Sequence, residues 1–137
     1  MLLLGCATVL ALSTGYRAAI AFNQAARNGN LARVVELVEA MGTSRLDIEG
    51  AFLRAASNGH VGIMGYLLDR GASDTTGALV CAAVHNQVPT VKYLIYHPCV
   101  YVDRTALKFA AVAAGNNEAV DVEFFLLTKL RHASDEQ

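Results

Sequence analysis

The sequence predicts an all-α solenoid, in which short helix-turn-helix repeats stack side by side and are joined by short loops. Three observations predict it. A pair of alanines recurs four times, at separations of 30, 27 and 28 residues. The first three pairs are followed three positions later by Gly29, Gly59 or Asn86, each able to adopt a left-handed backbone. An apolar segment with helical spacing follows each time, and such a constant period indicates a repeat array. The pairs are Ala25-Ala26, Ala55-Ala56, Ala82-Ala83 and Ala110-Ala111.

Length and composition are compatible with one such domain. The 137 residues are 54% apolar and 17% charged, so the chain can bury a core and disorder is not expected before the C-terminal tail. The net charge of −1 provides no basic surface for nucleic acid or for an anionic membrane. We therefore expect neither nucleic-acid nor membrane binding.

The alanine-rich segment of each unit is expected to form the first helix, with small side chains that let neighbouring units approach closely. The glycine or asparagine then forms a tight turn before the second helix. This arrangement places the four repeats at residues 16–46, 47–73, 74–103 and 104–130, followed by a polar tail at 131–137.

The second helices are predicted from apolar residues at helical spacing. Pro89 fits the first turn of the third of these helices, where a missing N–H costs nothing. Gly42 and Gly71 stand where a glycine commonly ends a helix. The apolar positions of the first three are Leu31, Val34, Val35, Leu37 and Val38; Val61, Met64, Leu67 and Leu68; and Val91, Leu94 and Ile95.

The fourth unit departs from this pattern. Its glycine, Gly115, comes one residue late, and residues 120–127 are apolar on nearly all sides of a helix. Terminal repeats normally have a polar outer face. We therefore expect this C-terminal helix to be covered by a homodimer contact or by a further partner.

The N-terminal segment has two competing interpretations. Residues 1–15 begin MLLLGCATVLAL, an uncharged apolar run of signal-peptide length that is too short to span a bilayer. Alternatively, Gly15 lies 27 residues before Gly42, so residues 2–12 would be the second helix of a half repeat that caps the first full unit. Leu3, Val9 and Leu12 would then pack on Leu31, Val34 and Val38. A lipoprotein-type Cys6 is a third interpretation, although the run before it is short.

The three cysteines, Cys6, Cys81 and Cys99, are odd in number and lack metal-ligand spacing. We interpret them as reduced thiols packed like small hydrophobic side chains. There is also no Asn-x-Ser/Thr glycosylation site. Both features favour an intracellular, cytoplasmic protein, or a secreted one if residues 1–15 are a signal peptide.

No catalytic, cofactor or metal site is expected. The four histidines form no His-x-x-x-His pair, and no glycine-rich phosphate loop follows a strand. His97 and Cys99 could face a metal together, but packing or solvent contact in a loop is the simpler interpretation. A small thiol- or metal-dependent enzyme on a helical scaffold stays open as a third hypothesis.

Taken as a set, these motifs resemble the ankyrin-repeat family over about residues 16–130. The best unit, Gly50–Ser73 (GAFLRAASNGHVGIMGYLLDRGAS), has the alanine pair, the Gly-His turn, the Leu-Leu pair and the closing Gly-Ala. The family's Thr-Pro-Leu-His start is replaced in every unit, as in Gly50-Ala51-Phe52-Leu53. The periods of 27–30 residues are below the usual ~33 and resemble those of oomycete and giant-virus ankyrin proteins.

The resemblance implies a non-catalytic protein-interaction module that binds a partner through a concave groove and the loop tips. In the family, the two residues after each alanine pair point into the groove, and His60 matches a structural turn histidine. Loop tips are expected at residues 47–49, 74–76 and 101–103. For Asn28 and Asn58 we favour a role in the turn, and a secreted effector with a cleaved signal is the alternative function. The candidate partner-binding residues are Arg27, Asn28, Ser57, Asn58, His85, Asp74 and Tyr101.

Overall fold

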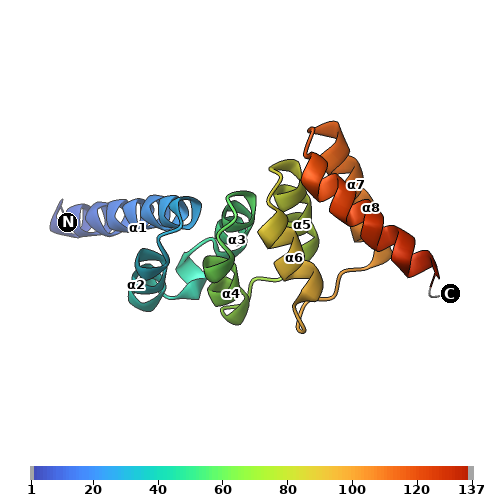
Figure 1. Cartoon of the computed structure of the whole chain (residues 1–137). Coiled ribbons are helices and arrows are strands. Elements are labelled where there is room, and N and C mark those ends of the chain that lie inside the picture. Colours follow the sequence, from blue (N-terminus) through green and yellow to red (C-terminus); the bar gives the residue numbers. More distant parts are fainter. Residues whose placement is uncertain (1, 136–137) are drawn as a thin grey trace.

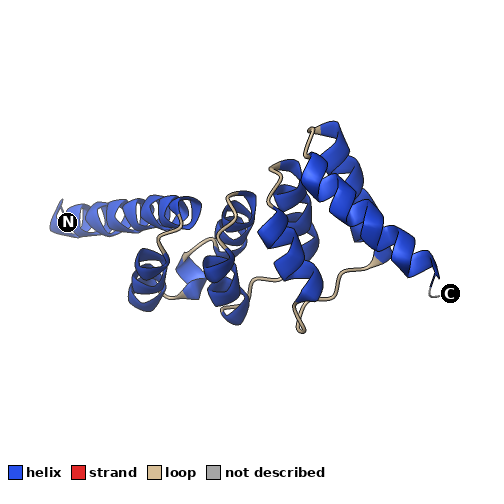
Figure 2. Ribbon diagram, in the orientation of Figure 1, coloured by secondary structure: helices blue, strands red, loops and turns tan. Residues whose placement is uncertain are grey.

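The computed structural model describes the backbone of residues 2–135 and the side chains of residues 14–135. Over this range the chain forms eight α-helices, one short 3-10 helix and no strand (Figure 2). The predicted all-α class is therefore confirmed. None of the described helices is long and apolar enough to cross a membrane. The helices are α1 (Leu2–Asn28), α2 (Leu31–Met41), α3 (Ile48–Ser57), α4 (Val61–Asp69), α5 (Thr75–Val84), α6 (Val88–Tyr96), α7 (Arg104–Asn116) and α8 (Val120–Asp135), with the 3-10 helix η1 (Thr43–Arg45).

The helices form four pairs that follow one another in a row (Figure 1). The first helices α1, α3, α5 and α7 pack successively against one another, and each also packs against the second helix of its own pair. The second helices contact one another less extensively. The alanine-rich helices therefore form the spine of the stack.

The spine is built from small side chains, as the alanine pattern predicts. Ala55 and Ala82 are fully buried between successive pairs. Larger apolar side chains of the same helices belong to the core as well, and Phe22, Phe52 and Leu79 are completely buried. Because alanine adds almost no width, neighbouring helices come close enough for these larger groups to interlock.

The turns inside the first three pairs have the expected left-handed residue. Gly29, Gly59 and Asn86 have φ angles of 81°, 79° and 55°. In the fourth pair this residue is Glu118, with φ of 59°, and Gly115 lies within α7 instead. The prediction of a late turn glycine was therefore wrong.

The cause is the length of α7. The backbone N–H groups of His60 and Gln87 donate to the carbonyl oxygens of Ala55 and Ala82. In the fourth pair, the backbone N–H of Ala119 donates to the carbonyl oxygen of Ala114 in the same way. Helix α7 has 13 residues where α3 and α5 have 10, so the alanine that closes the turn is Ala114. The pair Ala110-Ala111 is buried about one helical turn earlier.

Two of the expected loop tips belong to helices. Asp47, Asp74 and Asp103 are N-cap residues, and each carboxylate accepts a hydrogen bond from a backbone N–H three residues later. Residues 48–49 and 75–76 therefore form the first turns of α3 and α5. An aspartate at the N-cap satisfies a helix N–H that has no partner within the helix.

The N-terminal segment does not fold back as a separate second helix. Helix α1 runs without a break through Gly15, and its N-terminal part projects beyond α2 in Figure 1. Gly15 carries no left-handed backbone, and one glycine inside a helix costs only about 1 kcal/mol, so it does not end α1. The expected packing of Leu3, Val9 and Leu12 lies outside the described side chains. At the other end, α8 extends to Asp135, so most of the predicted polar tail is helical.

Candidate functional site

Four of the seven candidate residues line one pocket of about 400 Å³, together with a fifth residue that the sequence analysis missed. The pocket lies where the C-terminal ends of three successive first helices meet. Its lining residues are Arg27 from α1, Arg54, Ser57 and Asn58 at the end of α3, and His85 at the end of α5. We call it the Arg27 pocket. Arg54 could have been predicted, because it lies one helical turn before Asn58 and shares its face of α3.

The backbone beside Arg27 is fixed by the next repeat. The Nε2 atom of His60 lies 2.9 Å from the carbonyl oxygen of Arg27, which accepts a hydrogen bond from it. The imidazole ring packs so closely on Gly29 that a Cβ at this position would lie 2.7 Å from Cε1 of the ring. His60 therefore has the structural role that the resemblance implied, because it binds the backbone of Arg27 beside the pocket.

The polar side chains on α3 and at the end of α5 use part of their hydrogen-bonding capacity on carbonyl groups of their own helices. Asn58 donates from Nδ2 to the carbonyl of Arg54 (2.8 Å), and Ser57 donates its hydroxyl proton to the carbonyl of Leu53 (3.0 Å). In His85, Nδ1 lies 2.9 Å from the carbonyl oxygen of Cys81. Because a carbonyl only accepts, Nδ1 carries the proton and Nε2 is left as an acceptor.

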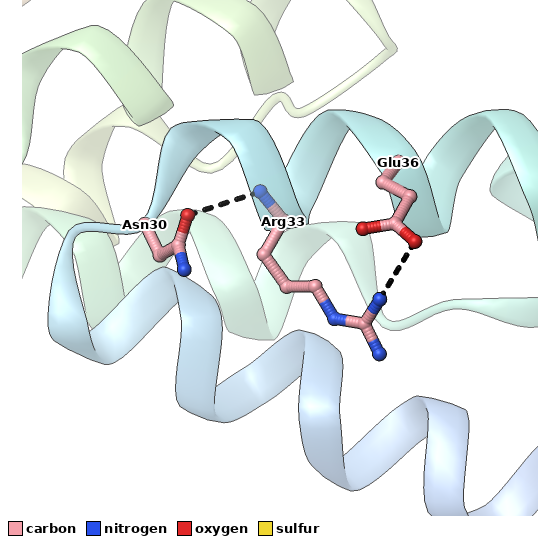
Figure 3. Close-up of polar contacts among 3 residues, drawn as sticks. All are labelled: Asn30, Arg33 and Glu36. Carbon is pink, nitrogen blue, oxygen red and sulfur yellow. Dashed lines mark hydrogen bonds and ion pairs between the residues drawn. The ribbon is translucent and has the colours of Figure 1, made fainter.

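The two arginines of the pocket carry charges that no described side chain neutralises. Among the side chains of residues 14–135, no carboxylate forms an ion pair with Arg27 or Arg54, and no acidic residue lines the pocket. Arg33 on α2 provides a contrast: its Nη1 atom lies 2.8 Å from Oε1 of Glu36, and its backbone N–H is capped by Asn30 (Figure 3). The Arg27 pocket is therefore a positively charged site that is open to solvent.

The comparison with protein families is decisive for the fold. The family described as ankyrin repeats (3 copies) matches residues 22–102, which is more than half of the chain. The chain belongs to the ankyrin-repeat family. The search among curated proteins finds no match.

Ankyrin repeats generally serve as protein-interaction modules and are typically not enzymes. The matched segment contains the whole Arg27 pocket and the first three helix pairs from Phe22 onwards. The fourth pair, α7 and α8, follows the matched segment and packs on α5 as a further repeat.

Three of the candidate binding residues of this ankyrin protein do not line the pocket. Asn28 is the exposed last residue of α1, and Tyr101 is 85% exposed in the loop between α6 and α7. Asp74 accepts a hydrogen bond from the N–H of Gly77 (2.8 Å) at the start of α5. Asn28 is the chain neighbour of Arg27, but neither it nor Asp74 nor Tyr101 is among the lining residues.

A polar junction between the second and third ankyrin repeats was also missed. One carboxylate oxygen of Glu49 accepts bonds from the backbone N–H and the hydroxyl of Ser73, both 2.8 Å, and the other accepts from the N–H of Asp74 at 3.2 Å. Partial burial alone would raise the pKa of Glu49, but these hydrogen bonds outweigh it and lower the pKa below its ordinary value. The junction ties α3 to the loop before α5.

The expected apolar surface is present on the fourth pair. On the outer side of α7 and α8 lies a shallow pocket of about 300 Å³, and Val112 and Leu127 in its lining are 62% and 51% exposed. Phe109, on the same helix as Val112, is 65% exposed. We call Phe109, Val112 and Leu127 the C-terminal end surface. A second apolar groove, lined in part by Val120 and Phe124, lies between α6 and α8.

The residues considered for chemistry are held by ordinary packing. His97 accepts a hydrogen bond at Nδ1 from the backbone N–H of Cys99 (3.2 Å), and its ring lies 5.0 Å from that of Tyr93. Cys81 and Cys99 are free thiols. No group of three or more potential metal ligands occurs among the described residues.

Proposed function

We propose that this chain is a non-catalytic protein-interaction module that binds a segment of a partner protein in the Arg27 pocket. The observation that carries the proposal is the convergence of polar side chains from three successive repeats on one open pocket. Stacking of the repeats uses the alanine faces and leaves Arg27, Arg54 and His85 exposed. A row of first helices holds these groups at fixed spacing, which lowers the entropy that a partner loses on binding.

A peptide-display selection on the full chain tests this proposal. Selected peptides should lose binding to Asn58→Tyr, because the ring would fill the pocket. Asn117→Tyr is the matched control, because Asn117 caps α7 through the carbonyl of Ala113 (2.8 Å) as Asn58 caps α3, but lies outside the pocket. Peptides that bind both variants as well as they bind the original chain would contradict the proposal.

We also propose that the C-terminal end surface associates with the same surface of a second copy. Helices α3 and α5 each have a first helix on both sides, whereas α7 has α5 on one side and, within residues 2–135, none on the other. Exposed apolar side chains at such a stacking position are typical of an interface. A two-fold contact between two copies would cover both surfaces at once.

The N-terminal segment and the cellular location belong to the same proposal. We favour an intracellular protein that keeps residues 1–15, and the alternative is a secreted effector from which they are cleaved. The intact mass of the protein from its native source separates these cases, since cleavage removes the mass of the segment.

A further inference from the structure

We propose that the Arg27 pocket recognises carboxylate groups, so that its ligand is an acidic segment of a partner protein. This inference rests on the proposed function and specifies the chemistry of the partner. It starts from Arg27 and Arg54, which both line one pocket that contains no acidic residue and which form no ion pair with a described carboxylate.

The geometry leaves room for the Arg54 guanidinium on α3. A Cβ at Gly50 would lie 2.8 Å from Nη1 of Arg54, so the absence of a side chain at position 50 permits this placement. Asp47 is close by, but its carboxylate accepts the N–H of Gly50 and forms no ion pair with Arg54. The guanidinium therefore keeps its donors for a ligand.

Helix electrostatics favours the charge of Arg27 but does not use its hydrogen-bond donors. Arg27 lies in the last turn of α1, where a positive charge is favoured by the helix dipole, whereas the guanidinium of Arg54 reaches back to Gly50 in the first turn of α3. That interaction acts along the helix axis and leaves the planar N–H groups facing water. A carboxylate can accept two parallel hydrogen bonds from one guanidinium, which makes it the matching ligand.

The remaining residues also fit a peptide. The Asn58 side-chain carbonyl and Nε2 of His85 are left as acceptors, and they can receive backbone N–H groups of an extended chain. A nucleic acid fits less well, because the pocket offers a single ring, that of His85, for base stacking and the chain has a net charge of −1. The pocket combines anion recognition with peptide hydrogen bonding.

The test is fluorescence anisotropy of the full chain with a labelled peptide of alternating glutamate and serine, and with the same peptide carrying glutamine for glutamate. The glutamate peptide should bind about tenfold more tightly, and added salt should remove the difference. In the double variant Arg27→Ala/Arg54→Ala, the affinity for the glutamate peptide should fall to that for the glutamine peptide. Arg33→Ala, which removes an arginine outside the pocket, should leave both affinities unchanged.

The inference would be overturned if the two peptides bound equally well. It would also be overturned if Arg33→Ala lost as much affinity for the glutamate peptide as the double variant does. Binding of a phosphoserine version of the glutamine peptide, without binding of the glutamate peptide, would also overturn the assignment to carboxylates. If display-selected peptides lose binding to Asn58→Tyr but contain no acidic residues, the proposed function stands and this inference fails. If Asn58→Tyr weakens no peptide at all, the proposed function itself fails.

Discussion

Single side chains at the turns connect each repeat to the next. His60 reaches back to the end of α1, and Gln87 occupies the corresponding place beside Gly59. Between the third and fourth pairs the contact runs in the opposite direction, from Asn86 to α8. Its Nδ2 donates to Asp121 (3.0 Å), and its Oδ1 accepts from the N–H of Val122 (3.2 Å). This explains why the turn residue is asparagine here and glycine in the two earlier repeats.

Substitution of Asn86 should separate its two roles. Asn86→Gly keeps the left-handed backbone but loses both hydrogen bonds, so we expect a loss of about 1–2 kcal/mol in the free energy of unfolding. Asn86→Ala adds the strain of an alanine at φ of 55° and should cost roughly 1 kcal/mol more. Urea denaturation of the original chain and the two variants measures their free energies of unfolding. An alanine variant as stable as the glycine variant would contradict the expected order.

Glu49 predicts a pH dependence of stability. The pKa of Glu49 is lower in the folded protein than in the unfolded chain, so the ionised carboxylate stabilises the fold. This stabilisation is complete above the pKa of Glu49 in the unfolded chain and is lost as the pH falls through its pKa in the folded protein. The difference in melting temperature between the original chain and Glu49→Gln should therefore be largest near neutral pH and shrink in acid. A difference that stays constant across this range would show that the carboxylate charge contributes nothing.

At the scale of elements, the first helices are limited in width by their neighbours. Ala82 is fully buried on α5, which packs against α3 on one side and α7 on the other. Ala82→Leu should overpack this junction and cost about 1–3 kcal/mol in the free energy of unfolding. Ala40→Leu on α2 is the matched control, because Ala40 is exposed and should change stability by less than about 0.5 kcal/mol. Identical melting curves for the original chain and Ala82→Leu would contradict the assigned stacking face.

The sequence could predict those elements whose boundaries depend on local residue chemistry. The Gly29 and Gly59 turns, and the second helices behind them, follow from backbone preference and apolar spacing alone. The extra turn of α7 could not be predicted, because Ala113 and Ala114 continue the alanine pattern and Glu118 has no strong left-handed preference. The unbroken α1 was missed for a related reason, since Gly15 matches the repeat period but lacks the neighbours that would end a helix.

The candidate site could be predicted only in part, because some of its residues are placed by the folded structure and not by their position in the repeat. The two residues after each alanine pair lie at the same end of successive first helices, so Arg27, Ser57 and His85 could be grouped from the repeat alone. Arg54 precedes its pair, so its position in the repeat does not select it, and only the face of α3 that it shares with Asn58 places it in the pocket. Asp74 matched a loop position, but N-capping of α5 uses its carboxylate.

At the scale of the whole molecule, the two sides of the fourth pair differ in what covers them. The side of α7 that faces α5 is packed with buried alanines, whereas the C-terminal end surface carries exposed apolar side chains. Each internal junction of the stack buries the equivalent surface. A repeat array with one uncovered apolar end gains stability by association, because stability is close to a sum of repeat and junction contributions.

We therefore expect the full chain to form a dimer whose fraction rises with concentration, and the double variant Val112→Glu/Leu127→Glu to stay monomeric. Two glutamates at a two-fold contact place four like charges in a surface that excludes water, which opposes association. Both positions are more than half exposed, so the variant should keep its fold and a melting temperature close to that of the original chain. Tyr101→Glu serves as the control, because it changes a side chain that is 85% exposed in a loop away from this surface. Sedimentation equilibrium over a range of concentrations measures the masses, and a dimer that persists in the double variant, or a chain that stays monomeric throughout, would exclude association through this surface.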